Sequence, residues 1–273
     1  GTSGEQKTIT VLVNGDNKVE LDETFTVALG AITLAPAGVT TAGSPQTGTI
    51  TNDDAATVAL VGNVSQSEAT TPQVFSVSLS NPVDVAVTVN FSTTDGTATT
   101  ADNDYTGITN QVVTFAAGTT TAQTVNVTVV NDAKVEANEG FNVGLSSLGA
   151  SGRNVSLGTS IGTGTIQNDD AATVTLSIPS TPYLQNEGNS GTTAYVFTAT
   201  LNNPVQGGFA VAYTTNNGLA IAPEDYTDND GILSFAGTAG EIKTITVLAN
   251  GDLKVEANED FSVELGSITG APA

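Results

Sequence analysis

The 273-residue chain contains no cysteine, methionine, tryptophan or histidine. Without cysteine there is neither a disulfide framework nor a thiolate metal site. Without histidine there is no imidazole base for catalysis and no histidine-ligated zinc. Glycosidases use paired carboxylates, but they need a cleft with aromatic platforms, and only 5% of these residues are aromatic. We therefore expect a protein that is not an enzyme.

Positive charge is also scarce, with 6 Lys and Arg against 28 Asp and Glu and a net charge of −22. Such a surface repels nucleic acid and anionic membranes. No apolar run approaches the roughly 20 residues of a membrane-spanning helix, and no signal peptide is visible. We expect no nucleic-acid partner and no direct membrane insertion of this segment.

An internal repeat organises the chain. Gly1–Ala37 returns as Gly237–Ala273 with 26 identical residues in 37, and a more diverged copy lies at Thr121–Leu145. The stretch "NDDAATV" also occurs twice, beginning at Asn52 and, 116 residues later, at Asn168. The repeating unit is therefore one domain of 116–120 residues, and its outer copies resemble each other more than the middle one.

The repeat divides the chain into three segments, which we call the first, middle and third domains. Residues 1–54 are interpreted as the C-terminal part of a domain, 55–170 as a complete domain, and 171–273 as the N-terminal part of a domain without its last strand. Because the first residues already resemble the interior of a domain, we expect the chain to be a piece of a longer polypeptide.

Apolar residues alternate with polar ones throughout the middle domain, as in Phe75, Val77 and Leu79, which is typical of half-buried β-strands. Turn signals rich in Gly, Asn, Asp and Pro separate these runs. Seven strands are expected, at 56–61, 73–80, 85–92, 111–115, 123–130, 141–146 and 162–167. The pattern predicts an all-β protein of tandem antiparallel, immunoglobulin-like, seven-stranded β-sandwiches in an extended array.

Acidic residues follow alternate strands of this predicted sandwich. Because successive strands run in opposite directions, the ends of the first, third, fifth and seventh strands share one pole, where the acids should converge. In the middle domain these are Glu68, Asp104, Asp132, Glu136, Glu139, Asp169 and Asp170. The first domain has Asp16, Glu20, Glu23, Asp53 and Asp54, and the third has Glu187, Asp225, Asp252, Glu256 and Glu259.

Clustered carboxylates raise one another's pKa and destabilise a fold unless a cation lies among them, and the six basic residues are too few. Hard oxygen ligands on loops favour Ca²⁺, which accepts 6–8 oxygens in flexible geometry, over Mg²⁺. We interpret these acids as calcium ligands, supplied where one domain meets the next. The alternative is that they are solvated turn residues that keep the protein soluble.

The spacing "D-x-x-x-E-x-x-E-x-F" from Asp132, the preceding Asp104-Tyr105 and the closing Asn168–Asp170 together resemble the Calx-β family over the whole chain. The resemblance implies a seven-stranded β-sandwich that binds Ca²⁺ at one tip, through the acids named above. This family occurs in sodium–calcium exchangers as regulatory modules and in microbial surface and adhesion proteins as tandem arrays. Asn131 and Asn168 replace further aspartates of the family, which implies fewer or weaker calcium sites.

We therefore expect a calcium-stiffened structural segment of a long extracellular fibre or adhesin stalk at a microbial cell surface. "NDD" leads directly into the next domain, without the flexible linker that would let domains swing freely. The expected partners are neighbouring repeats of the same chain, or head-to-tail filament subunits that donate strands. Two alternatives remain: a glycan- or receptor-recognition module, and a calcium-sensing regulatory domain. Near-identical repeats favour the array.

Overall fold

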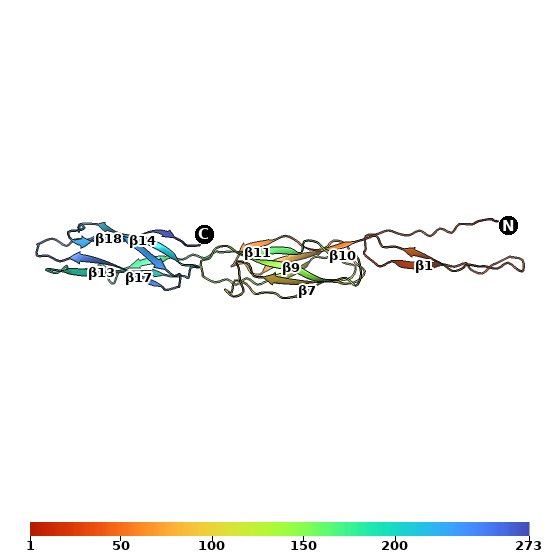
Figure 1. The fold of residues 1–273 in the computed structure, drawn as a ribbon, viewed down its shortest axis with the longest axis horizontal. Helices are drawn as coiled ribbons and strands as arrows, with labels where there is room; N and C mark the ends of the chain where they lie inside the picture. Colours follow the sequence, from red (N-terminus) through yellow and green to blue (C-terminus); the bar gives the residue numbers. More distant parts are fainter. Residues whose placement is uncertain (273) are drawn as a thin grey trace.

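A computed structural model describes residues 1–272, and it forms its regular structure from strands alone. The strands fall into three groups that follow one another along a narrow, extended molecule (Figure 1). Within the described residues, nothing helical reaches the length and hydropathy that a membrane-crossing helix needs. The all-β tandem architecture predicted from the alternation is confirmed.

The middle domain is a two-layer sandwich, because its alternating residues give each sheet one apolar face. One sheet has the strand order β10-β3-β5-β8 and the other has the order β4-β11-β9-β6-β7. The strands are β3 (Ala56–Leu60), β4 (Val64–Ser67), β5 (Gln73–Leu79), β6 (Val87–Thr94), β7 (Gln111–Phe115), β8 (Gln123–Val127), β9 (Glu139–Gly149), β10 (Val155–Leu157) and β11 (Ile161–Gln167). Along β5 the residues of one face are all buried, from Gln73 to Leu79.

Two short strands were not expected from the sequence. β4 and β10 pair in parallel with β11 and β3, whereas the other pairs of the sandwich are antiparallel. Gly62, with a φ of +75°, lies between β3 and β4, and a left-handed residue of this kind suits glycine. The first stretch of the domain thereby crosses from one sheet to the other, and this carries Glu68 to the pole of the sandwich.

Aromatic rings fill the centre of the middle domain. Phe141 stacks on Tyr105 with ring centroids 4.4 Å apart and meets Phe75 edge-on at 6.0 Å. Phe75 also contacts Phe91 at 5.8 Å. The Tyr105 hydroxyl donates to Asp95 at 2.7 Å, so the buried ring keeps a hydrogen-bonding partner for its polar end.

The third domain repeats the arrangement with two sheets, in the orders β12-β13-β17-β15 and β16-β14-β18. Its strands are β12 (Val174–Ser177), β13 (Thr192–Leu201), β14 (Phe209–Asn217), β15 (Tyr226–Thr227), β16 (Gly231–Phe235), β17 (Ile242–Asn250) and β18 (Phe261–Thr269). It has an apolar core of its own, to which Phe197, Leu201, Tyr226 and Ile245 contribute.

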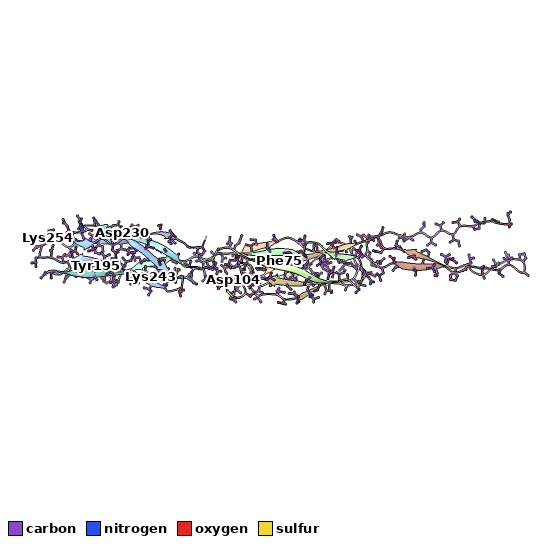
Figure 2. The ribbon with its side chains drawn as sticks, in the orientation of Figure 1. Phe75, Asp104, Tyr195, Asp230, Lys243 and Lys254 are labelled. Carbon is purple, nitrogen blue, oxygen red and sulfur yellow. The ribbon has the colours of Figure 1, made fainter. Side chains whose placement is uncertain are left out.

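The first domain forms a single antiparallel pair, β1 (Glu23–Val27) with β2 (Gln46–Ile50). Residues 1–22 make no strand, and the apolar side chains of Ile9, Val11, Leu12 and Val13 are exposed. Figure 2 shows Phe75 inside the middle domain, Asp104 at the end of that domain facing the third, and Lys254 at the far end of the molecule.

Candidate metal centre

Four segments bring their acids to one end of the middle domain. Glu68 follows β4, Asp104 lies between β6 and β7, Asp132 follows β8, and Asp170 follows β11. A pocket at this end is lined by Glu68, Asp104, Asp132, Glu136 and Glu139, together with Val130, Ala137, Ile166 and Asn168. The convergence expected from alternating strand directions is therefore present in the structure.

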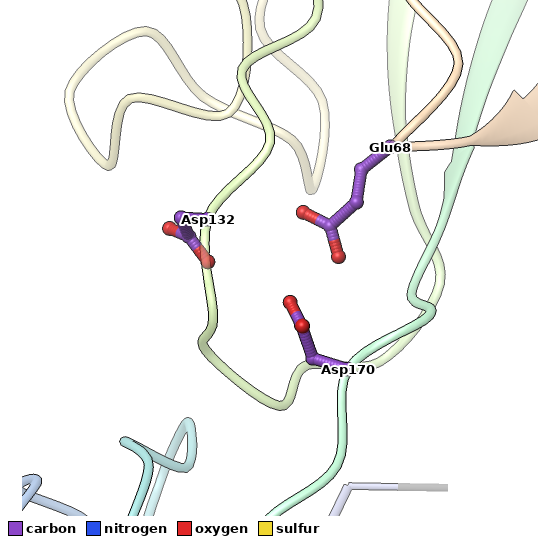
Figure 3. Close-up of side chains that lie close together, drawn as sticks. All are labelled: Glu68, Asp132 and Asp170. Carbon is purple, nitrogen blue, oxygen red and sulfur yellow. The ribbon is translucent and has the colours of Figure 1, made fainter.

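One group of three carboxylates contains Glu68, Asp132 and Asp170, which offer oxygens within 4.8 Å of one another. Figure 3 shows the carboxylates of Glu68 and Asp170 pointing toward each other, with Asp132 opposite them. Oδ2 of Asp170 is buried and has no hydrogen-bond partner among residues 1–272. A buried carboxylate oxygen without a donor is costly, so this oxygen has the character of an unused ligand for a cation.

Glu68 is the most deeply buried acid of this group, with 4% of its surface exposed. Burial raises its pKa to about 7, and the nearby charges of Asp170 and Asp132 act in the same direction. The backbone N–H of Asp169 donates to the Glu68 carboxylate and opposes the shift. A divalent cation between these three side chains would remove the repulsion and stabilise their charged forms.

A second group of three contains Asp102, Asp104 and Glu136. Here a positive charge is already present, because Nζ of Lys134 lies 2.7 Å from Asp102 Oδ2 and 2.5 Å from Glu136 Oε1. Burial lowers the pKa of Lys134, but the hydrogen bonds to Asp102 and Glu136 raise it more, and the net shift is upward. The ammonium group therefore offsets part of the negative charge of this group, whereas no ion pair within residues 1–272 involves Glu68, Asp132 or Asp170, which makes these three the better metal site.

Asp102 was not among the predicted ligands, because the sequence around it is typical of a solvated turn. Its place beside Lys134, 32 positions further along the chain, depends on the intervening segment folding back to the same pole. The sequence gives one indication of a charge that compensates these carboxylates. A lysine recurs two residues before a glutamate in each domain, at Lys18, Lys134 and Lys254. Each of these lysines pairs with that glutamate in the structure.

The side chain of Asn168 forms hydrogen bonds that join two loops at the acidic pole. Its side-chain oxygen accepts a hydrogen bond of 2.9 Å from the Glu136 N–H, and its amide donates to the Asp170 carbonyl at 3.2 Å. Asn52 makes the same two contacts with Glu20 and Asp54, at 3.0 and 2.9 Å. The asparagine of "NDD" therefore ties the loop after the fifth predicted strand to the end of the last one.

The two remaining predicted ligands of the middle domain lie outside both groups. Burial raises the pKa of Glu139, and a hydrogen bond of 2.9 Å from the side chain of Gln206 in the third domain opposes the shift. Asp169 is exposed and accepts a hydrogen bond from the Ser67 hydroxyl. Glu139 consequently links the acidic pole to the next domain, while Asp169 faces the outside of the loop.

The third domain forms two comparable groups, Glu187 with Asp252 and Glu256, and Asp225 with Glu256 and Glu259. Burial and the charges of Asp225 and Glu256 raise the pKa of Glu259. In the first domain the five predicted ligands join no such group within residues 1–272. Those five are Asp16, Glu20, Glu23, Asp53 and Asp54, and none has near it a counterpart of Glu68 or Asp104.

The sequence matches the family model described as the Calx-beta domain in three places, at residues 2–56, 51–170 and 168–272. Domains of this family bind calcium. The oxygen-only donor set and the unpaired, buried oxygen of Asp170 fit such an ion. No curated protein sequence matches the chain.

Several solved structures are similar to this one. CBD12 from CALX1.2 is 21% identical, with 78% of this chain and 80% of that chain covered and a TM-score of 0.39. The apo-form Calx CBD1 domain is 24% identical, with 43% of this chain and 100% of that chain covered and a TM-score of 0.39. The calcium binding domain CBD12 of CALX1.1 is 22% identical over 77% of this chain and 79% of that chain, with a TM-score of 0.38.

Proposed function

The chain belongs to the Calx-beta domain family, and from this premise we propose that it is a non-catalytic, calcium-binding structural segment of an extended extracellular fibre or adhesin stalk. In this role calcium stiffens the junctions between consecutive domains. The observation that carries the proposal is the place of the Glu68, Asp132 and Asp170 group, since Asp170 is the last residue before the third domain.

The proposed calcium site lies directly beside the junction between the middle and third domains. Asp170 continues directly into Ala171, whose carbonyl accepts a hydrogen bond of 2.8 Å from Asn203 in the third domain. Gln206 of the third domain donates to Glu139 beside the acidic pole. An ion held by Glu68, Asp132 and Asp170 would therefore hold the loops from which the next domain departs, and its loss would loosen them through charge repulsion.

We propose Glu68, Asp132 and Asp170 as the principal ligands in the middle domain, and their equivalents Glu187 and Asp252 in the third, where Glu256 is already paired with Lys254. Backbone carbonyls and water would complete the 6–8 oxygens that Ca²⁺ accepts. Extracellular modules bind calcium with dissociation constants of about 10⁻⁴–10⁻³ M, which suits the calcium concentration outside cells. A location at a microbial cell surface is part of this proposal.

The test is calorimetric calcium titration and thermal unfolding of the whole chain, in about 2 mM calcium and in excess chelator. Calcium at 2–20 times its dissociation constant stabilises a site by about 0.6–1.8 kcal/mol, which raises Tm by about 2–7 °C. Small-angle scattering should show a narrower distribution of lengths with calcium than without it.

The matched variants are Asp170→Asn and Asp54→Asn, which change equivalent residues of successive domains. Asp170→Asn should weaken one calcium site at least about 10-fold because it removes a charged ligand, whereas Asp54→Asn should leave that site unchanged. If calcium alters neither Tm nor scattering, the acids serve solubility and the stalk proposal fails. Sub-micromolar affinity with a change of shape would instead favour the calcium-sensing alternative.

A further inference from the structure

The first and middle domains are joined by a contact centred on Val19. The Val19 N–H donates to the carbonyl of Pro82 at 2.9 Å, and the Val19 carbonyl accepts from the Asp84 N–H at 3.1 Å. The Val19 side chain is 0% exposed and belongs to the apolar core of the middle domain, together with Val83. One domain thus inserts a valine from its acidic loop into the core of the next.

The middle and third domains are joined in the same way. The Val135 N–H donates to the carbonyl of Pro204 at 2.9 Å, and the Val135 carbonyl accepts from the Gln206 N–H at 2.9 Å. Val19 forms a parallel bridge with Val83, and Val135 forms one with Val205. The Val135 side chain packs against the core of the third domain.

The receiving segment is also the same at both junctions. It consists of Asn-Pro-Val, at 81–83 in the middle domain and 203–205 in the third, and we call it the Asn-Pro-Val loop. Its asparagine binds the first residue of its own domain, since Asn81 donates to the Ala55 carbonyl and Asn203 to the Ala171 carbonyl, each at 2.8 Å. This loop therefore holds the connecting chain and receives the valine of the preceding domain.

Within the residues that the structure describes, the third domain presents the same valine without a partner. Val255 occupies the position of Val19 and Val135 in "KVE", and its side chain is 99% exposed. The loop around it is already formed, because Lys254 N–H donates to Asp252 Oδ1 at 2.7 Å, as Lys134 does to Asp132 at 2.7 Å. Within residues 1–272 no backbone group bonds to Val255.

We propose that the loop at Lys254–Glu256 is a docking surface for the Asn-Pro-Val loop of a following Calx-beta domain, whose core receives Val255. The occupant is inferred by continuity with the two junctions in the same chain. Because the third domain resembles the first at 26 of 37 aligned residues, the partner is of the middle-domain type, with Asp84 after its Asn-Pro-Val loop. Valine and backbone groups make the contact, so it does not require the calcium of the proposed function.

The absence of cysteine allows a direct test by thiol reactivity. Val19→Cys, Val135→Cys and Val255→Cys are made singly in the whole chain, and alkylation by a maleimide is timed in chelator and in calcium. Cys at position 255 should react at least about 10-fold faster than at position 19, because only the latter needs the junction to open. Equal rates at the two positions in both conditions would show that the valine contact does not form in solution.

The partner is tested by continuing the repeat. Since Gly1–Ala37 aligns with Gly237–Ala273, appending residues 38–170 after Ala273 supplies the next domain in phase. In the extended chain, alkylation of the Val255→Cys variant should slow to the rate measured for the Val19→Cys variant. Leu253→Cys is the control, because Asn17 and Ala133 at the equivalent positions are exposed, and its thiol should stay fast.

The outcomes separate this inference from the calcium proposal. Slow alkylation at position 255 of the extended chain in chelator supports docking without the ion. Slow alkylation only in calcium supports the docking but contradicts its independence from the ion. If the Val255→Cys variant of the extended chain is alkylated as fast as the Leu253→Cys control in both conditions, the inference is overturned. Calcium titration of the same chains decides the proposed function independently.

Discussion

Gly1–Ala37 and Gly237–Ala273 are nearly the same sequence, yet they adopt different structures. In the third domain, Ile242–Asn250 forms β17 between β13 and β15. In the first domain the equivalent residues form no strand. Ile245 is 1% exposed whereas Ile9 at the same repeat position is 61% exposed. The difference shows that an alternating sequence becomes a buried strand only where neighbouring strands offer hydrogen bonds and an apolar face.

The strongest test of this comparison truncates the two equivalent isoleucines. Ile245→Ala should destabilise the third domain by about 2–5 kcal/mol, because it leaves a cavity in a packed core. Ile9→Ala should change stability by no more than about 0.5 kcal/mol, because its side chain is already in water. Denaturant unfolding followed by hydrogen exchange of β17 measures both, and similar costs would contradict the structural difference between the copies.

The acidic poles offer a second test, because the first domain contains no counterpart of Glu68. Since the folded pKa of Glu68 is about 7, above its ordinary value of 4.5, its contribution to stability is complete below about pH 4.5 and is lost as the pH rises through 7. In chelator, the middle domain should therefore lose up to about 3 kcal/mol between pH 4.5 and 8.

Urea unfolding across this pH range measures the loss, and Glu68→Gln is the matched variant. The free energy of unfolding of this variant should depend less on pH than that of the native chain, because the glutamine side chain does not titrate. Calcium should also flatten the native profile above pH 7, where the ion stabilises the charged carboxylate. An equally steep profile for Glu68→Gln in chelator would exclude Glu68 as the source.

A smaller effect is expected at two equivalent glycines. A Cβ on Gly164 would lie 2.4 Å from the Phe141 ring and 2.6 Å from Gln73 Oε1, and a Cβ on Gly48 would lie 2.5 Å from the Phe25 ring. Phe141 is buried between Tyr105 and Phe75, so Gly164→Ala should cost about 1–3 kcal/mol. Phe25 is only half-buried and its ring can move, so Gly48→Ala should cost no more than about 0.5 kcal/mol.

Thermal unfolding of the two alanine variants measures this difference. Gly144→Ala provides a control in β9, because its nearest neighbour would be an ordinary 3.9 Å away. Equal costs at positions 164 and 48 would indicate that the first domain packs around Phe25 as tightly as the middle domain packs around Phe141.

The candidate site was largely predictable because short turns join the strands, so that successive strands run in opposite directions. Glu68, Asp132 and Asp170 come from three distant segments. They were expected to meet because they follow the first, fifth and seventh of the predicted strands, whose ends share one pole. The displacement of Asp169 toward Ser67 and the tie made by Asn168 depend on local turn geometry, which spacing does not encode. Asp102 was missed because its partner Lys134 is close only after folding.

The sequence by itself determined the all-β class, the repeat and the convergence of acids, because each depends on local alternation or on copies that can be aligned. Only the tertiary structure decided which copy of the repeat is buried and which valine is covered. Val19 and Val255 share the same neighbours in sequence but are 0% and 99% exposed. The physical reason is that burial and pairing require a second surface, which neighbouring strands of the same domain supply to Ile245 and the next domain along the chain supplies to Val19.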